Sequence, residues 1–290
     1  MAILLVGSAA LPVFVATQGI VNVSKQSLLL KFKQSLAQQN TNFKENYVIW
    51  SATEAATEAN TIAEVVQAMK IDLSNPQQVA AGRDLLQTFI GKFKVIEDSG
   101  ALEKNIRILT DAQGRTVIQN IQTLPEESFN SPTDKLNFNS AYRRVSLPTG
   151  IYLGDIPIVQ NALKSGKNLS GTELLKSDFL KRLGQDKQAN IGVKSQPTQG
   201  ISQEEQPFPE GTYDIEGGKA GLMAMSVNPI KVGNKVVGTV IVGGLINRTE
   251  VMVDFFKSNQ GVPVSTIFAK DWRVSTNVPY TDGKTRAIGT

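Results

Sequence analysis

Two adjacent arginines, Arg143 and Arg144, are the grouping in this sequence with the clearest capacity for chemistry. A tyrosine, Tyr142, directly precedes them, and Tyr152 follows in the same proline-containing stretch. A planar guanidinium group can bind a carboxylate through two parallel hydrogen bonds, so the arginines could clamp a carboxylate ligand. The alternative is that one or both are ordinary solvent-exposed loop residues, which is the common environment of arginine. Both interpretations stay open.

Catalytic chemistry has few residues to use, because the sequence contains no histidine and no cysteine. This excludes Ser-His-Asp and Cys-His hydrolases, thiolate zinc sites, iron–sulfur clusters and histidine acid–base catalysis. The acidic residues do not follow the spacing of a calcium-binding EF-hand loop. Phosphate-loop, dinucleotide-binding and nucleophile-elbow patterns are also missing. We therefore expect no enzyme activity in this chain, and no cofactor or metal.

The charge of the chain is nearly balanced, with 30 Lys and Arg against 26 Asp and Glu. Basic residues form no long run and do not alternate with aromatic residues, as they do in many nucleic-acid-binding surfaces. The sequence therefore predicts a solvated surface of mixed charge and no nucleic-acid partner. Apolar residues make up 41% of the chain, which predicts a globular protein with a core.

Residues 1–17 carry no charge, and weaker apolar character continues to residue 23. A membrane-spanning helix needs about 20 mainly apolar residues. We therefore expect a transmembrane signal anchor over residues 1–23, followed by an extracytoplasmic region. The positive flank that normally precedes such a segment is missing, which suggests that the chain is also trimmed at its start. A cleaved signal peptide and a buried core helix are the alternatives.

A helical arm is expected over residues 24–100. No proline or glycine occurs from residue 24 to 72, and Leu29, Leu36, Phe43 and Trp50 recur every seven residues. Ala59, Ile62, Val66 and Met69 continue the apolar stripe at spacings of three and four. The stripe could form a parallel homodimer or pack on the following domain of the same chain. After Ser74-Asn75-Pro76 a second helix is expected from residue 77 to about 97, with Ser74 or Asn75 as its cap.

The rest of the chain predicts an α+β fold. Residues 106–119 have the pattern of two strands joined by a turn at 111–114. A short helix is expected at 156–165, a strand from 168, and a surface insertion at the polar residues 185–218. Two further strands are expected at 222–229 and 236–245, then a helix at 248–259 and a final strand pair at 264–270 and 272–276.

This order of elements resembles an extracytoplasmic double Cache sensor domain, in which helices cover a PAS-like antiparallel sheet. The segment NALKSGKNLSGTE at residues 161–173 is similar to the helix-to-strand passage of such domains. PIKVGNKVVGTVIVG at 229–243 is similar to their closing hairpin. STIF at 265–268, RVSTNV at 273–278 and RAIGT at 286–290 are similar to the start of a second, membrane-proximal Cache unit. The expected domains are therefore a sensor domain at 101–247 and an incomplete second unit at 248–290.

The resemblance implies a bacterial transmembrane receptor, with the sensor periplasmic or extracellular and the protein held in the inner membrane. Its missing output would be a histidine kinase, a chemoreceptor signalling region or a nucleotide cyclase, and the glutamine- and asparagine-rich composition suggests a cyanobacterial source. A small molecule would lie between the sheet and its cover. The alternative is an extracytoplasmic protein-interaction module without a pocket, which close packing beneath residues 142–152 would favour.

The resemblance also points to particular ligand-binding residues. They come from the cover (Tyr142, Arg143, Arg144 and Tyr152) and from the strand beyond it (Thr172 and Glu173). Candidates in the second unit are Arg273, Ser275, Thr276 and Asn277, whose polarity is also explained by an ordinary strand and turn.

Overall fold

The computed structural model describes residue 26 and residues 29–31, 33–35, 37–45, 50–91, 104–129, 131–136, 142–193 and 215–290. It divides into two units, Met1–Asn46 and Tyr47–Thr290. The described residues of the first unit are helical, as expected for the arm, and Leu29 is 53% exposed. Within the described residues no helix is both long and apolar enough to cross a membrane. The expected anchor at residues 1–23 lies outside them.

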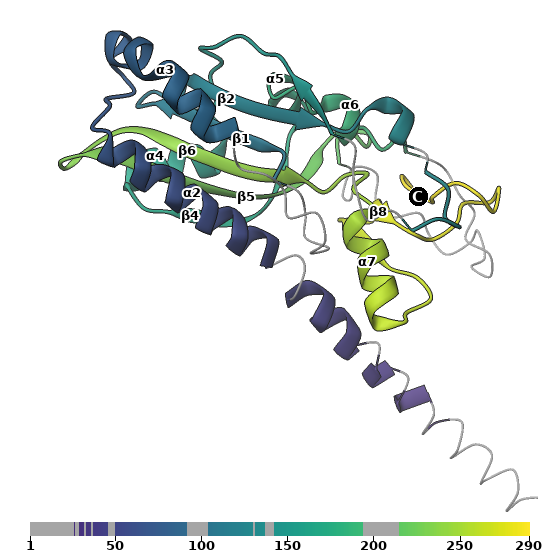
Figure 1. Ribbon diagram of the computed structural model, residues 1–290. Helices are drawn as coiled ribbons and strands as arrows, with labels where there is room; N and C mark the ends of the chain where they lie inside the picture. Colours follow the sequence, from purple (N-terminus) through teal and green to yellow (C-terminus); the bar gives the residue numbers. More distant parts are fainter. Residues whose placement is uncertain are drawn as a thin grey trace, which may run out of the picture. The chain divides into compact units, whose positions relative to one another are not determined.

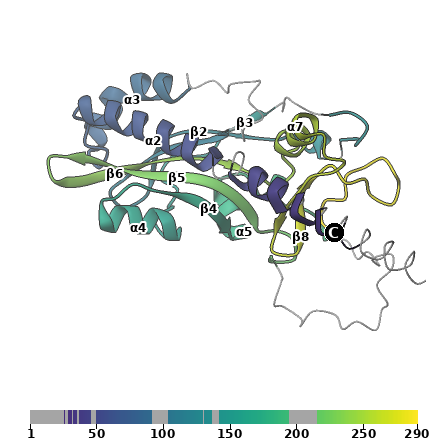
Figure 2. The same ribbon diagram turned by 90° about the horizontal axis from the view of Figure 1, so that it is seen from below.

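The second unit is built on a six-stranded sheet in which every neighbouring pair of strands is antiparallel (Figures 1 and 2). The strand order across the sheet is β3-β2-β1-β6-β5-β4. The strands are β1 (Ile106–Asp111), β2 (Thr116–Thr123), β3 (Arg143–Val145), β4 (Leu169–Leu175), β5 (Gly221–Val232) and β6 (Lys235–Leu245). The α+β class and the antiparallel sheet expected from the sequence are confirmed.

The turn between β1 and β2 is stabilised by hydrogen bonds to the side chain of Asp111. The Asp111 carboxylate accepts hydrogen bonds from the backbone N–H groups of Gln113 (2.9 Å) and Arg115 (2.8 Å). Gly114 has φ +79°, a left-handed conformation that glycine adopts without the steric cost of a Cβ atom. This local chemistry explains why the strand pair could be read from the sequence.

Helices α2 (Trp50–Ala68) and α3 (Pro76–Gly91) cover one face of the sheet. The apolar stripe of α2, including Ala59, Ile62 and Val66, is fully buried against strands β5 and β6. For this part of the arm, packing on the same chain is therefore what the structure shows. The Asn75 side chain accepts hydrogen bonds from the N–H groups of Gln77 (3.0 Å) and Gln78 (3.3 Å), so the expected cap of α3 is present.

The stretch without proline or glycine, which ends at residue 72, is not helical to its end, because α2 stops at Ala68. Residues 69–75 form a turn in which Lys70 has φ +54°. The turn is needed because it reverses the chain, so that α3 can also lie on the sheet. The expected extension of the second helix beyond Gly91 falls on residues outside the described ranges.

The other face of the sheet is covered by α4 (Pro157–Ser165), α5 (Ser177–Arg182), α6 (Asp186–Ala189) and the loop before α4. The expected surface insertion at 185–218 is wrong at both described ends. Gln185, Gln188 and Ile191 at the first end are at most 1% exposed, and Ile215 at the second end is 1% exposed. Polar composition misleads here because the glutamine side chains make internal hydrogen bonds instead of facing solvent.

The chain leaves β6 through residues 246–250 and enters helix α7 (Val251–Gln260). A two-stranded antiparallel sheet follows, made of β7 (Thr266–Ala269) and β8 (Trp272–Thr276). We call residues 246–290 the C-terminal segment. Its helix and strand pair were expected from the sequence, with boundaries that differ by a few residues.

Candidate functional site

Five of the six residues expected to bind a ligand lie at opposite edges of the sheet, and the sixth, Tyr152, bridges to Arg115 beside the turn between β1 and β2. Arg143 and Arg144 lie on β3, and Thr172 and Glu173 lie on β4, which is the strand at the other end of the strand order. The structure therefore brings Tyr142, Arg143 and Arg144 together as chain neighbours but does not bring them to the two β4 residues. Their role in ligand binding stays a prediction.

The two arginines of the cover are exposed. Arg143 forms an ion pair with Glu127, and these side chains are 68% and 60% exposed. The Tyr152 ring is 41% exposed and lies 5.5 Å from the guanidinium carbon of Arg115. The backbone carbonyl of Tyr152 accepts a hydrogen bond from Arg182, which also pairs with Asp155 (2.9 Å). These groups are arranged on the surface and not around a buried ligand position.

The layer beneath the cover is filled by apolar side chains. Leu153 and Ile156 are 0% and 1% exposed, and they belong to the same core cluster as residues of β1 and β2. Gln119, on β2, donates hydrogen bonds to the carbonyls of Leu147 (2.6 Å) and Pro148 (3.1 Å), which ties the cover to the sheet. This is the close packing that favours an interaction module over a small-molecule pocket.

Three of the four candidates in the C-terminal segment are buried and have internal hydrogen bonds. The Ser275 hydroxyl donates to the Thr249 carbonyl, and the Thr276 hydroxyl lies 2.7 Å from that of Thr266. The Asn277 amide donates to the Val253 carbonyl (3.0 Å) and accepts from the Ser265 N–H (2.7 Å). These contacts join the β7–β8 strand pair to α7.

Arg273, the fourth candidate, lies at the edge of this small sheet. Its guanidinium group donates to the Thr290 hydroxyl (2.6 Å) and lies 5.4 Å from the centroid of the Phe268 ring. The Phe268 side chain is 47% exposed, so this pair is accessible from solvent.

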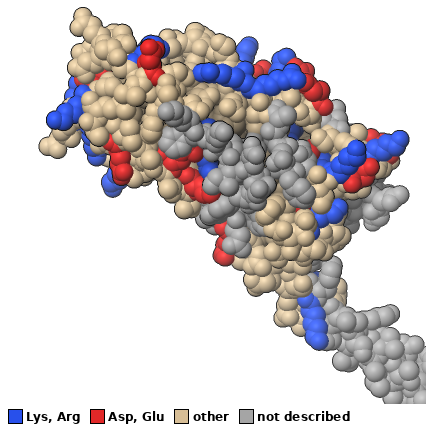
Figure 3. Space-filling view, viewed as in Figure 1, with Lys and Arg blue, Asp and Glu red and all other residues tan. Residues whose placement is uncertain are grey.

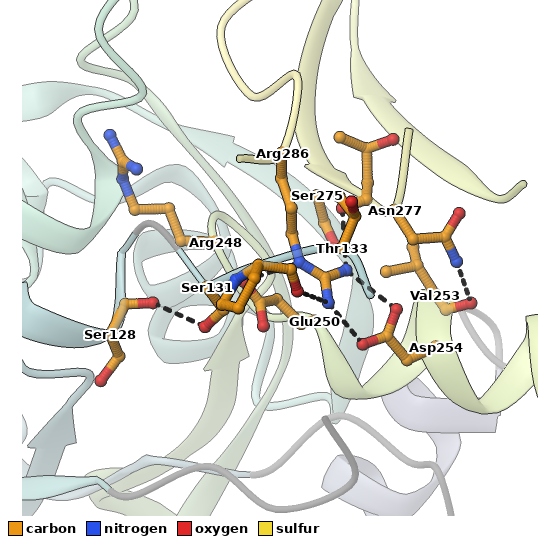
Figure 4. A network of polar contacts seen from close by, with 12 residues as sticks. Ser128, Ser131, Thr133, Arg248, Glu250, Val253, Asp254, Ser275, Asn277 and Arg286 are labelled. Atoms are coloured by element: carbon orange, nitrogen blue, oxygen red, sulfur yellow. Dashed lines mark hydrogen bonds and ion pairs between the residues drawn. The ribbon is translucent and has the colours of Figure 1, made fainter. Parts of the chain in front are cut away.

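The main buried charge cluster of the C-terminal segment was not expected from the sequence (Figure 4). Arg286 pairs with both carboxylate oxygens of Asp254, at 2.8 and 2.7 Å, and its Nε lies 3.1 Å from Glu250. The three side chains are at most 3% exposed. Two carboxylates face one guanidinium group in the protein interior, which is costly unless further polar groups take part.

Carbonyl groups of the loop after β2 complete the surroundings of Arg286. Its guanidinium group lies 3.5 Å from the carbonyl of Pro132 and 3.4 Å from that of Lys135. The backbone N–H of Thr133 donates to the Lys284 carbonyl (2.9 Å). The cluster thus fastens the C-terminal segment to a loop of the sheet.

Arg248 makes a second connection to this loop. Its side chain donates to the carbonyls of Asn190 (2.7 and 3.1 Å) and Phe129 (3.2 Å), and it lies 4.8 Å from the Phe129 ring centroid. Burial lowers the pKa of Arg248 from its ordinary value. The guanidinium group nevertheless stays charged at neutral pH, because the ordinary value lies far above it.

The sequence indicates the two carboxylates of the Arg286 cluster but not the arginine. Glu250 and Asp254 are four residues apart, which places them on the same side of a helix, and the residues between them are apolar. That spacing places two carboxylates side by side on one helix, but it does not show that they face the core. Nothing in the sequence identifies Arg286, which is distant in the chain, as their partner.

The polar groups of the C-terminal segment hold parts of the structure together and do not resemble a reaction centre. The carboxylates pair with the guanidinium group of Arg286, and the Asn277 amide is hydrogen-bonded to backbone groups. No cluster of acidic residues that could hold a metal ion occurs within the described residues. On the face in Figure 3, basic and acidic side chains are interspersed over the described surface, as the balanced charge predicts.

The comparison with known families finds a match on this same segment. Residues 244–290 match the family described as single Cache domain 3. None of the curated proteins and none of the solved structures matches the chain significantly. The family match and the antiparallel sheet together confirm the Cache-like, PAS-like resemblance expected from the sequence.

Proposed function

We propose that this Cache-bearing chain is the extracytoplasmic ligand-sensing region of a membrane-bound signal-transduction receptor. Cache domains are extracytoplasmic sensors of signalling receptors, and the match to residues 244–290 is the observation that carries the proposal. A sensing role also fits the absence of histidine and cysteine from the sequence. The anchor would be residues 1–23, and the output a histidine kinase, a chemoreceptor region or a nucleotide cyclase.

The proposed mechanism is a shift in population between two arrangements of the cover. A ligand that binds one arrangement better than the other favours that arrangement by the difference in binding free energy. The loop after β2 connects the cover to Arg286 and Arg248, so a change in the cover would reach α7 through these contacts. A homodimer formed through the helical arm would carry the change to the output.

The ligand class that best fits the exposed arginines is a small carboxylate. Arg144 is exposed on β3 beside Arg143, and a carboxylate could displace Glu127 from Arg143 because that ion pair is exposed and therefore weak. A carboxylate bound in this way stays at the surface unless the cover moves, since apolar side chains fill the layer beneath it.

The test is a thermal-shift screen of the full chain against small carboxylates, amines and nucleobases, with isothermal titration calorimetry of each compound that raises the melting temperature. A ligand at one hundred times its Kd adds about 2.7 kcal/mol to the free energy of unfolding. Loss of the shift in Arg143→Ala and Arg144→Ala would support the carboxylate site. No stabilising compound in any class would count against ligand sensing.

The second candidate is an extracytoplasmic protein-interaction module without a small-molecule pocket. The packed layer of Leu153 and Ile156 beneath the cover favours it. It predicts that no small molecule stabilises the chain, while crosslinking at the cover in membranes captures a protein partner whose binding is lost in Arg143→Glu.

A further inference from the structure

We propose that residues 104–107, at the start of β1, couple α2 to the C-terminal segment. These residues bind α2 through two side chains and the end of β6 through a third. A displacement on one side would therefore change the other. This coupling goes beyond ligand sensing, and it holds whether or not the chain binds a small molecule.

The α2 side of the connection rests on a repeated tetrapeptide. The sequence ATEA occurs twice in succession, at residues 52–55 and 56–59. One helical turn separates the two glutamates, so both face the start of β1. Glu54 pairs with Lys104 at 2.7 Å, and Glu58 pairs with Arg107, whose side chain is 4% exposed.

The two ion pairs are joined to each other. The guanidinium group of Arg107 also donates to the backbone carbonyl of Lys104 at 2.6 Å. Glu54, Lys104, Arg107 and Glu58 thus form one polar connection between the helix and the strand. Because Arg107 and Glu58 are largely buried, breaking their contact leaves charged groups without adequate solvation.

These pairs matter because the described side chains of residues 51–59 bury little apolar surface. The buried ones among them are small: Ser51, Ala52, Ala55 and Ala59. The second half buries the larger side chains of Ile62 and Val66. Hydrophobic stabilisation grows with the apolar area removed from water, so the second half is anchored by packing and the first depends more on its ion pairs.

Asn105 makes the connection on the other side of residues 104–107. Its side-chain oxygen accepts the Leu245 N–H (3.2 Å), and its amide group donates to the Gln122 carbonyl (2.7 Å) and to Gln185 (3.2 Å). Asn105 is 2% exposed and Gln185 is 0% exposed. The start of β1 is thereby bonded to the last residue of β6.

From this point buried amides continue into the C-terminal segment. The Asn247 side chain donates to the carbonyls of Ala189 (2.7 Å) and Ala220 (3.1 Å), and the backbone carbonyl of Asn247 accepts a hydrogen bond from the Gln188 side chain (3.0 Å). The next residue, Arg248, donates its N–H to the Val274 carbonyl on β8 (2.7 Å). Each of these polar groups lies where water cannot easily replace a lost partner. Breaking a single hydrogen bond of the network is therefore costly.

Lys104, Asn105 and Arg107 belong to one short stretch of extended chain, and each makes a buried or partly buried polar contact. A shift of the first half of α2 must either break its ion pairs or move this stretch. Moving the stretch strains the Asn105 contacts with β6. The same argument runs in reverse, because coupling between two sites is reciprocal.

Native-state hydrogen exchange of the full chain tests the coupling. Glu58→Gln weakens the α2 side and Asn105→Ala weakens the β6 side. Ile62→Val is the control, because it loosens the same helix without touching residues 104–107. We expect Glu58→Gln to raise exchange in residues 245–256 at least fivefold more than the control does, after each is divided by the rise of exchange in β4, which reports global unfolding, since coupling between sites is commonly about 5–150-fold.

Reciprocity supplies the second criterion. Asn105→Ala should raise exchange in the first half of α2 by a similar factor. If the Asn105→Ala variant does not fold, Gln185→Met is used in its place, because it removes one hydrogen-bond partner of Asn105. The proposal is overturned if each variant loosens only its own side, or if Ile62→Val affects residues 245–256 as strongly as Glu58→Gln.

Discussion

The two glutamates of the α2 repeat allow a test of how burial sets the strength of an ion pair. Glu54 and Glu58 occupy the same position in identical tetrapeptides on one helix. Replacing either with glutamine keeps the size of the side chain and nearly the same helix propensity. The local sequence is therefore matched, and the two variants differ mainly in the partner that loses its carboxylate.

The expected losses follow from the exposure of each pair. Arg107 and Glu58 side chains are 4% and 12% exposed, whereas those of Lys104 and Glu54 are 18% and 21% exposed. Removing one partner of a fully buried pair costs about 3–5 kcal/mol, and glutamine retains one hydrogen bond, so we expect about 2–3 kcal/mol for Glu58→Gln. For Glu54→Gln, where Lys104 can reach water, we expect about 1 kcal/mol or less.

Urea denaturation followed by tryptophan fluorescence gives the free energy of unfolding of each variant. The denaturation midpoint should fall more for Glu58→Gln than for Glu54→Gln, with the slope m unchanged in both. In a thermal scan the difference of about 2 kcal/mol corresponds to roughly 4–8 °C for a unit of this size. Equal losses in the two variants would refute the argument from burial, and a changed slope would mean that the helix itself had been lost.

Three further substitutions test other parts of the structure. Arg286→Met leaves Asp254 buried without its cation and should lower the free energy of unfolding by about 3–5 kcal/mol in urea denaturation; a loss under 1 kcal/mol would show that the cluster is solvated. Gly238→Ala would place a Cβ atom 2.0 Å from a carbonyl of β1, so a lower melting temperature is expected, whereas Gly171→Ala meets nothing within 4 Å and serves as its control. Arg143→Ala removes an ion pair whose side chains are 68% and 60% exposed, so its melting temperature should stay within about 1 °C of the unchanged chain; a larger fall would show that Arg143 stabilises the fold.

Where local chemistry dominates, the sequence predicts the structure well. The turn at Asp111–Gly114, the Asn75 cap and the apolar alternation of the strands all act over a few residues, so they can be recognised without knowledge of the fold. The same holds for the α+β class and for the apolar stripe of α2. The absence of histidine and cysteine likewise limited the chemistry before any fold was known.

The expected ligand site shows what local reasoning cannot supply. Arg143 and Thr172 were grouped because both belonged to the sheet and its cover, yet β3 and β4 lie at opposite ends of the strand order. Strand order depends on pairing between distant segments, which residue patterns do not encode. The packed layer of Leu153 and Ile156 is likewise a property of the assembled core.

The element types and the mixed-charge surface follow from propensity, turn residues and composition, which are local properties, and the resemblance to a Cache sensor follows from short sequence segments. Which polar residues are buried, and with what partners, depends on the tertiary structure. Arg286 meets Asp254 and Glu250, and Asn105 meets the end of β6, only because the folded sheet and the C-terminal segment bring distant residues together. A polar residue in an isolated sequence is most simply read as solvent-exposed, and only the assembled core shows that its hydrogen-bonding groups are satisfied inside.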